Sequence, residues 1–418
     1  MVPDGWQFEK LGNFIEFKNG MNAEKSAYGS GVKFVNVMDV FAHDFLHKTD
    51  VRGSMQASEK QRNEYSVIRG DILFNRTSET FDEIAMTAIY TDDEPIVFGG
   101  FVIRGRQTKK LLTTRYSGYC FQPKFVRREL IRRAQGAVRA NIGQKDLGDV
   151  QILVPPLHEQ ERIAEILSTW DRAVQATEKL IANCQAQKKA LMQQLLTGKN
   201  RYSEFIKSNE FQRTKYGLIP QDWNFVQIGS IADEISERNV DGDDFPVLSC
   251  TKYDGFVSSL EYFKKKVFSD DTSNYKLIKY GQFGFPSNHI EEGSIGLQDI
   301  ADIGQVSPIY CVFQASHEID NGYLYKLLKT EHYRQIFAAF TNASVDRRGS
   351  LRWREFSKIY VPLPTLPEQR KISKSIDSVI EAEAILKTKL AAIQREKTAL
   401  MQQLLTGKRR VKIEEVAA

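Results

Sequence analysis

Four polar loops carry side chains of the kinds that hydrogen-bond to base edges in nucleic acids. FNRTSE supplies Asn75, Arg76, Thr77 and Ser78, and NIGQK supplies Asn141, Gln144 and Lys145. In the second half, PSNHIEEGS supplies Ser287, Asn288 and His289, and SVDRRGSLRWRE supplies Arg347, Arg348, Ser350 and Arg352. Arg pairs with guanine, and Asn or Gln with adenine. One such loop more often closes a turn, but each half has one after a Gly-led strand and one before a long helical segment.

The patterns of DNA-modifying catalysis are missing or incomplete. The sequence has no Asp/Asn-Pro-Pro-aromatic loop, no GxGxxG and no GxxxxGK[ST]. Pro3-Asp4 with Glu16-Phe17-Lys18 fits the PD…ExK spacing of Mg²⁺ nucleases, but Gln221 replaces the first acid in the second half. His43 and His47 lack the glutamate of HExxH. We therefore expect no catalytic residue, no metal site and no cofactor bound by this chain.

Two globular domains must position these loops. Residues 1–156 and 217–365 contain short β-type runs, such as VKFVNVMDV, GDILF and IYCVF, that Gly, Asp and Asn interrupt, which predicts mixed α/β domains. Each has a helix candidate, over residues 125–136 and 323–340. The first carries Arg127, Arg128, Arg132 and Arg133, which could follow phosphates, although such a helix face is more often only solvated.

The segments that flank these domains are repeated. ALMQQLLTGK occurs at Ala190–Lys199 and again at Ala399–Lys408, and LHEQERI and LPEQRKI stand at the same spacing of 209 residues. VPDGW at Val2–Trp6 likewise corresponds to IPQDW at Ile219–Trp223, whereas the domain interiors diverge. We interpret this distribution as two interchangeable recognition domains on one frame, in preference to a duplication that drifted without purpose.

Residues 157–198 and 366–407 each predict one helix of about 40 residues, roughly 60 Å long. Apolar residues recur at alternating steps of four and three, which is a heptad seam. The predicted pairing residues are Ile163, Leu167, Trp170, Val174, Ile181, Leu191 and Leu195 on the first helix, and Ile372, Ile376, Val379, Leu386, Leu390, Ile393, Leu400 and Leu404 on the second. Lys188 and Lys397 also fall on the seam, where they either fix the register or extend outward to water.

An apolar stripe of this length requires a partner. Pairing within the chain is favoured by the high effective concentration, and a two-fold relation between the halves would make the helices antiparallel. The alternatives are pairing between two chains of a homodimer, and a paired rod whose outer face binds another protein. Residues 199–216 are the expected linker and residues 408–418 a polar tail.

Bulk properties set outer bounds on the function. A chain of 418 residues with 41% hydrophobic residues is expected to hold more than one globular domain, and a net charge of +5 permits nucleic-acid binding without requiring it. Cys120, Cys184, Cys250 and Cys311 form no CxxC pair, and no run of 18 apolar residues occurs. We expect a cytoplasmic protein with reduced thiols and no membrane association.

Two variable domains that alternate with near-identical helices, opening with PxxEQxxI and closing with KxALMQQLLTGK, resemble the specificity subunit of type I restriction–modification systems. The resemblance covers essentially the whole chain. It implies an α+β fold, in which two mixed α/β target recognition domains are joined by two long helices that form an antiparallel coiled coil with internal pseudo-two-fold symmetry. It also implies that each variable domain reads one half of a bipartite, asymmetric site in double-stranded DNA, and that the helices set the spacer.

The same resemblance implies the partners. Two modification subunits, which bind S-adenosylmethionine and methylate adenine N6, would dock on the helices, and restriction subunits that use ATP and Mg²⁺ would join them. Such a specificity subunit has no catalysis of its own. The residues by themselves leave two other classes open: a structural coiled-coil assembly protein, and a self-sufficient DNA nuclease or methyltransferase.

Overall fold

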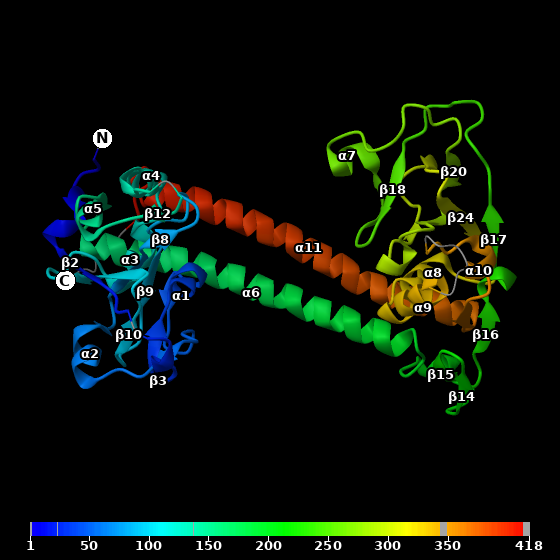
Figure 1. The fold of residues 1–418 in the computed structure, drawn as a ribbon, viewed down its shortest axis with the longest axis horizontal. Helices are drawn as coiled ribbons and strands as arrows, with labels where there is room; N and C mark the ends of the chain where they lie inside the picture. Colours follow the sequence, from blue (N-terminus) through cyan, green and yellow to red (C-terminus); the bar gives the residue numbers. More distant parts are fainter. Residues whose placement is uncertain (1, 23, 137, 343–348, 413–418) are drawn as a thin grey trace. The chain divides into compact units, whose positions relative to one another are not determined.

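The computed structural model describes residues 2–22, 24–136, 138–342 and 349–412. The chain divides into two compact units: Met1–Glu178 with Thr388–Ala418, and Lys179–Lys387. Helices α6 (Leu157–Leu195) and α11 (Leu366–Leu404) each begin in one unit and end in the other (Figure 1). Each unit therefore combines one globular domain with the start of one long helix and the end of the other.

The first unit is built on a five-stranded sheet of order β2-β11-β7-β9-β4, with a four-stranded sheet of order β5-β3-β10-β6 and the pairs β1-β13 and β8-β12. Its strands are β1 (Gln7–Lys10), β2 (Ile15–Asn19), β3 (Tyr28–Val35), β4 (Phe45–Leu46), β5 (Ser54–Met55), β6 (Ser66–Val67), β7 (Ile72–Asn75), β8 (Thr77–Ser78), β9 (Thr87–Tyr90), β10 (Ile96–Phe98), β11 (Val102–Gln107), β12 (Ala140–Asn141) and β13 (Gln151–Val154). The helices are α1 (Val37–Ala42), α2 (Glu59–Glu64), α3 (Thr114–Cys120), α4 (Lys124–Arg133) and α5 (Gln144–Gly148).

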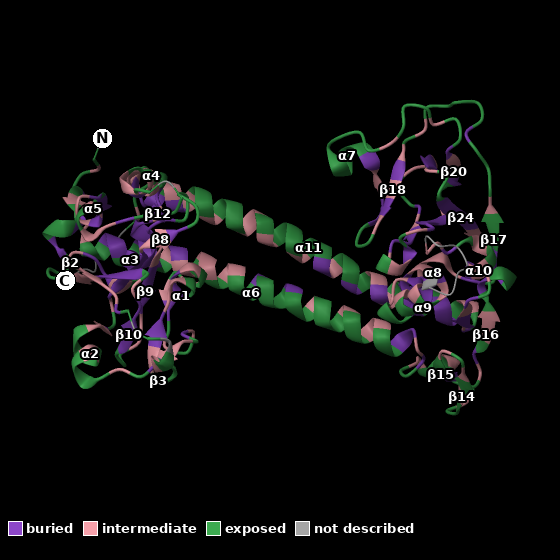
Figure 2. Cartoon of the chain, in the orientation of Figure 1, coloured by how far each residue is buried: buried purple, intermediate pink, exposed green. Residues whose placement is uncertain are grey.

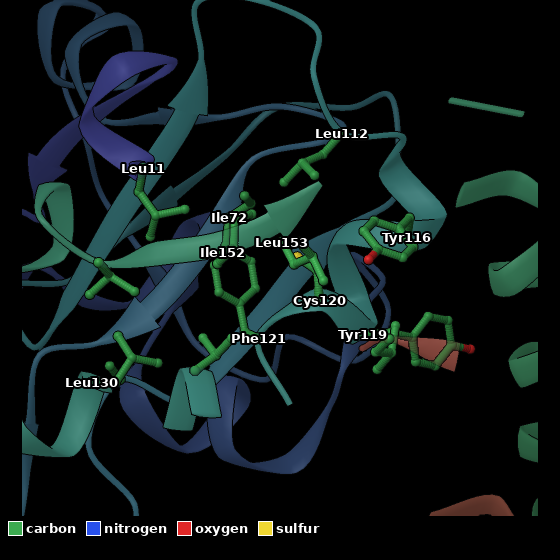
Figure 3. Packing of buried hydrophobic residues seen from close by; sticks show 14 of the residues in the cluster. Leu11, Ile72, Leu112, Tyr116, Tyr119, Cys120, Phe121, Leu130, Ile152 and Leu153 are labelled. Carbon is green, nitrogen blue, oxygen red and sulfur yellow. The ribbon is translucent and has the colours of Figure 1, made fainter. Parts of the chain in front are cut away.

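The largest core of the first unit lies where the sheets meet α3, α4 and the long helices. Leu11, Ile72, Tyr116, Phe121 and Ile152 pack together there (Figure 3). The same cluster takes in Ile163, Ala164 and Leu167 from the start of α6 and Met401, Leu404 and Leu405 from the end of α11. The helix ends are therefore part of the domain core and not an appendage to it.

The second unit has a four-stranded sheet of order β17-β24-β21-β22 and the pairs β14-β15, β16-β25, β18-β19 and β20-β23. Its strands are β14 (Phe211–Thr214), β15 (Gly217–Pro220), β16 (Asn224–Gln227), β17 (Ala232–Ile235), β18 (Leu248–Thr251), β19 (Gly255–Ser258), β20 (Lys276–Lys279), β21 (Phe283–Pro286), β22 (Gly296–Leu297), β23 (Ile303–Val306), β24 (Tyr310–Ala315) and β25 (Tyr360–Leu363). The shorter helices are α7 (Ser259–Phe263), α8 (Asn321–Leu328), α9 (Glu331–Asn342) and α10 (Trp353–Phe356).

Three strands of the two central sheets have the same order and register, β2-β11-β7 in the first unit and β17-β24-β21 in the second. In the first, β11 pairs with β7 so that Ile103 faces Phe74. In the second, β24 pairs with β21 so that Cys311 faces Phe285. This register makes positions of the two units equivalent even where their sequences have diverged.

Two local predictions were wrong, each because a polar side chain caps a different element. VKFVNVMDV is strand only in its first part, since Asn36 accepts from the Met38 N–H and caps α1. The single helix predicted over 323–340 is two helices, because Thr330 accepts from the Tyr333 N–H at the start of α9. The predicted linker 199–216 includes strand β14, which pairs with β15.

The long helices are antiparallel within each unit. In the first unit Asp171 pairs with Lys397 and Glu159 with Arg410. In the second, Lys188 pairs with Glu383 and Arg201 with Glu368, so numbers on α11 fall as those on α6 rise. The predicted α+β class, with two mixed domains and two long antiparallel helices, is confirmed.

Burial along the helices follows the heptad seam. None of the predicted pairing residues is exposed, whereas some apolar residues off the seam, such as Leu180 and Ile385, are exposed. Figure 2 shows buried, partly buried and exposed residues alternating along α6 and α11. Outside the seam the two helices are largely solvated, which is typical of a coiled-coil rod. Among the described residues, no helix is long and apolar enough to cross a lipid bilayer.

Candidate nucleic-acid interface

The two polar loops predicted in the first unit lie side by side. Strand β8, inside FNRTSE, pairs antiparallel with β12, which leads into NIGQK. The Ile142 N–H donates to the Arg76 carbonyl (3.0 Å), and Thr77 Oγ1 donates to Asn141 Oδ1 (2.8 Å). Segments more than 60 residues apart therefore form one polar surface at the end of β7.

Some predicted residues of this surface hold the loop instead of facing solvent. Asn75 is fully buried, and its Oδ1 accepts from the Met86 N–H (2.6 Å). Ser78 is also buried and donates to Glu83 (3.2 Å). Arg76 and Thr77 are half-buried, while Asn141 and Lys145 are exposed. The Gln144 amide is satisfied when it donates to the Phe17 carbonyl (2.9 Å).

The arginines of α4 do not act as one surface. Arg127 donates to the carbonyls of Asp82, Ile84 and Ala85, and burial lowers the pKa of its guanidinium. Arg133 pairs with Glu129 (3.0 Å). Arg128 and Arg132 are exposed, whereas internal acceptors hold the other two side chains.

The second unit repeats the juxtaposition of the loops. The Leu351 N–H donates to the Ser287 carbonyl (2.8 Å), which is the equivalent of the bond between Ile142 and Arg76. Ser287 is nearly buried, Asn288 is half-buried and His289 is exposed. Arg347 and Arg348 lie outside the described residues, whereas Ser350 is half-buried and Arg352 exposed.

Sequence reasoning missed one contributor to each surface. The turn between β10 and β11 places Phe101 beside Arg76, whose N–H donates to the Phe101 carbonyl (2.8 Å). In the second unit the Ser287 N–H donates to the Ile309 carbonyl (3.3 Å). The available signal was the pair Gly99-Gly100 before Phe101, because adjacent glycines mark a tight turn.

The EQ pair of each repeated segment anchors a long helix to its domain. Gln160 is fully buried; its Oε1 accepts from the Thr113 N–H (2.9 Å), and its Nε2 donates to the Leu111 carbonyl (2.8 Å). Gln369 makes the equivalent bonds with the Asp320 N–H (2.7 Å) and the Glu318 carbonyl (3.2 Å). Each glutamine thus satisfies backbone groups of the neighbouring domain where α6 or α11 begins.

The glutamates of the EQ pairs receive the opposite ends of the repeat. Trp223 Nε1 donates to Glu368 (3.1 Å), and Arg201, just past α6, donates to both oxygens of that carboxylate (2.8 and 3.0 Å). In the first unit Trp6 Nε1 donates to Glu159 (3.2 Å), and Arg410, just past α11, binds the same carboxylate. We call these two arrangements the clasps.

The glycine of LLTGK closes each clasp. Gly198 has a φ of +69°, and a Cβ there would lie 2.3 Å from Pro220. Gly407 has a φ of +67°, and a Cβ would lie 2.2 Å from Pro3. The end of each long helix therefore fits against the proline–tryptophan entrance of the domain in which the other helix starts. That fit explains why both the helix ends and the entrances recur while the domain interiors differ.

Residues 3–185 and 220–395 match the family described as "Type I restriction modification DNA specificity domain". The chain belongs to this family. It is 24% identical to the putative type I restriction enzyme MjaX specificity subunit of Methanocaldococcus jannaschii, across 98% of this chain and 95% of that protein. The MjaVIII specificity subunit of the same organism is 24% identical, across 98% and 94%. In fold the chain is similar to the type I system S subunit from M. genitalium, with a TM-score of 0.55 and 15% identity across 99% and 97% of the chains.

The two lysines on the heptad seam of this specificity-domain protein pair with acids on the opposite helix. Lys188 Nζ lies 3.6 Å from Glu383 Oε2, and Lys397 pairs with Asp171, which also accepts from the Tyr119 hydroxyl (2.5 Å). Hydrogen bonds from Lys387 and Gln185 lower the pKa of the Glu383 carboxyl. Of the two interpretations of these lysines, register fixing agrees with the contacts, because each meets an acid on the other helix.

The lysine of the nuclease-like pattern is paired with an acid outside that pattern, since Lys18 Nζ lies 3.2 Å from Glu64. The Asp4 backbone carbonyl, which is not the group that would bind Mg²⁺, accepts from Arg410 (2.9 Å). Within the described ranges, one group of side chains could hold a metal ion: His289, Glu291 and Glu292, on the loop after β21. Their ligand atoms lie within 4.8 Å of one another. His289 Nδ1 lies 3.2 Å from Glu292 there.

Proposed function

We propose that this chain is the DNA specificity subunit of a type I restriction–modification complex. Each unit reads one half of a bipartite, asymmetric site in double-stranded DNA, and the paired helices set the unread spacer between the halves. The observation that carries this proposal is the repeated loop pair. Equivalent hydrogen bonds, Ile142 to Arg76 and Leu351 to Ser287, join two polar loops at the same end of equivalent sheets, while the loop residues differ. Equivalent surfaces with different polar groups are what two different half-sites require.

The chemistry of modification belongs to partner subunits under this proposal. Two modification subunits bring S-adenosylmethionine and methylate adenine N6, and restriction subunits bring the ATP- and Mg²⁺-dependent steps. This chain binds none of these cofactors and supplies recognition alone. The names of the relatives, each a specificity subunit, support this division. Exposed lysines and arginines near the loops would neutralise phosphates and make the affinity depend on salt.

Sequencing that detects N6-methyladenine tests the proposal. A host that carries this chain and its modification subunit should show one bipartite motif with a fixed spacer. Substitution of Asn141, an exposed loop residue, by Ala should change or relax one half of that motif and leave the other half unchanged. Ile68→Ala, on the turn that precedes β7, is the matched control and should leave both halves unchanged. Methylation or cleavage of DNA by the purified chain alone would contradict the proposal.

A role as a coiled-coil assembly protein without DNA makes a different prediction. The assembled complex should bind the methylated motif's sequence with an affinity that falls steeply between about 50 and 200 mM salt, as phosphate contacts require. Affinity for DNA that is weak and independent of sequence at every salt concentration would favour the assembly role.

A further inference from the structure

An exposed apolar side chain occupies the same position beside the loop pair in both units. Phe101 is 63% exposed and Ile309 is 45% exposed. The register of the central sheets makes them equivalent, since Phe101 directly precedes Val102, which faces Asn75, and Ile309 directly precedes Tyr310, which faces Pro286. Isolated apolar residues on a surface are ordinary. The recurrence at one structural position, in domains whose sequences otherwise diverge, is what requires an explanation.

The two turns that present these side chains are built alike. The Val102 N–H donates to the Gly99 carbonyl (2.9 Å), and the Tyr310 N–H donates to the Ser307 carbonyl (2.9 Å). In the first unit the turn packs tightly, because a Cβ on Gly100 would lie 2.1 Å from Asn22 Oδ1. The backbone that carries each apolar side chain is therefore already held in a closed, hydrogen-bonded turn.

The polar loops lie immediately next to these side chains. The Phe101 carbonyl accepts from the Arg76 N–H and the Ile309 carbonyl from the Ser287 N–H, so each apolar residue adjoins the first residue of a reading loop. The backbone of that first residue in turn binds the second loop, through Ile142 or Leu351. Each surface thus joins hydrogen-bonding groups with one exposed hydrophobic group.

Hydrogen bonds cannot recognise one of the groups that the bases present in the major groove. The C5-methyl of thymine is apolar, and contact with an apolar side chain such as Phe is how proteins recognise it. We infer that Phe101 and Ile309 are specificity-determining residues that contact a thymine methyl, one in each half-site. The inference rests on the proposed function. It adds to that function the class of group recognised, which is the thymine methyl, and the residue in each unit that recognises it.

Replacement of thymine by deoxyuridine tests this inference, because it removes the methyl and leaves the hydrogen-bonding groups unchanged. The full chain, assembled with its modification subunit, is titrated onto duplexes in which each thymine of the methylated motif is replaced singly. The affinity should fall about fourfold at one thymine in each half-site, the expected effect of one buried methyl. Phe101→Ala should abolish that penalty in one half-site, and Ile309→Ala in the other.

Control variants separate this role from a general effect of exposed apolar residues. Ile68 and Tyr280 are also exposed, but they lie on the turns that precede β7 and β21, whereas the reading loops follow those strands. Ile68→Ala and Tyr280→Ala should keep both deoxyuridine penalties. Sequence-specific binding with no penalty at any thymine, or with penalties that persist in Phe101→Ala and Ile309→Ala, would overturn the inference alone. Loss of sequence-specific binding by the unaltered complex would instead overturn the proposed function.

Discussion

The clasp of the second unit holds a buried arginine between two carboxylates. Arg201 Nη1 donates to Asp222 (2.6 Å), its Nη2 donates to the Phe205 carbonyl (3.0 Å), and two of its nitrogens bind Glu368. The Arg201 side chain is 6% exposed and that of Glu368 is 1% exposed. Its guanidinium also lies over the Trp223 ring, 5.4 Å from the centroid. We predict that Arg201→Ala strongly destabilises the second unit.

The magnitude follows from the charges left behind. Without Arg201, the buried Glu368 carboxylate retains the Trp223 N–H as its remaining donor among the described contacts, and Asp222 loses its closest cation. Removal of one partner of a buried ion pair costs about 3–5 kcal/mol. The equivalent Arg410 is 42% exposed on its side chain, so water can replace part of what it donates to Glu159. For Arg410→Ala we expect the free energy of unfolding to fall by about 1.5–3 kcal/mol, which is the contribution of a hydrogen bond to a charged group.

Native-state hydrogen exchange, measured by mass spectrometry, is the suitable assay because it reports on each unit separately. Arg201→Ala should lower the free energy of opening in peptides around Trp223, and Arg410→Ala in peptides around Trp6. Arg201→Lys should rescue little, since an ammonium group cannot span the two carboxylates as a planar guanidinium does. An Arg201→Met, Glu368→Gln double variant should be more stable than Arg201→Ala, because it leaves no unpaired buried charge at position 368.

Arg201→Ala should not lower the opening free energy by less than about 1 kcal/mol, or by no more than Arg410→Ala does, since burial is the reason for the difference; either result would contradict the role of the buried charges. A double variant less stable than Arg201→Ala would also contradict that role. Arg354→Ala, an exposed arginine of the same unit, is the matched control and should change the opening free energy by no more than about 0.5 kcal/mol.

Three further predictions concern the helices. Seven residues inserted after position 178 of α6 and seven after position 390 of α11 keep the heptad seam and add about 10 Å, so the methylated motif should gain about three base pairs of spacer. The pKa of Glu383 is lowered in the fold, so its ionised form stabilises the fold above the unfolded-chain pKa of about 4.3, and this contribution is lost as pH falls below that value. Glu383→Gln should therefore make the free energy of unfolding in urea depend less steeply on pH in the acid range. Gly198→Ala should destabilise by more than the roughly 1 kcal/mol of left-handed backbone strain, because its Cβ would meet Pro220.

Each of these predictions has a matched control. A seven-residue insertion in α6 alone should weaken the pairing and not give a longer defined spacer. Glu381→Gln, an exposed acid on α11, should leave the acid dependence of urea stability unchanged. Gly242→Ala, where φ is +72° and a Cβ would meet nothing within 4 Å, should cost only the left-handed backbone strain, as measured by urea unfolding.

The sequence predicted the helices well because their determinants are local. The heptad spacing that predicts each helix lies within one segment, and the structure gives helices at Leu157–Leu195 and Leu366–Leu404. The predicted antiparallel pairing followed from a two-fold relation between the halves. The boundaries near Asn36 and Thr330 were missed because a capping side chain competed with the apolar pattern.

Only tertiary contacts decided which of the predicted recognition residues are buried and which are exposed. Asn75 and Asn141 are the same residue type in similar loops, yet one is fully buried around the Met86 N–H and the other is exposed. Arg127 and Arg128 are adjacent, and the carbonyls that hold Arg127 come from residues more than 40 positions away. Whether a polar side chain is available to a ligand depends on such distant acceptors, and no local pattern encodes them.

By itself the sequence determined that the chain has two unlike domains on a repeated helical frame, because periodicity and repetition are properties of residue order. It could not assign a role to the EQ pairs, to the LLTGK ends or to Phe101. The tertiary structure decided those roles by bringing the end of each helix to the start of the other, and by pairing strands from distant segments beside one turn. The physical reason is that burial, ion pairing and strand register depend on which segments meet in space.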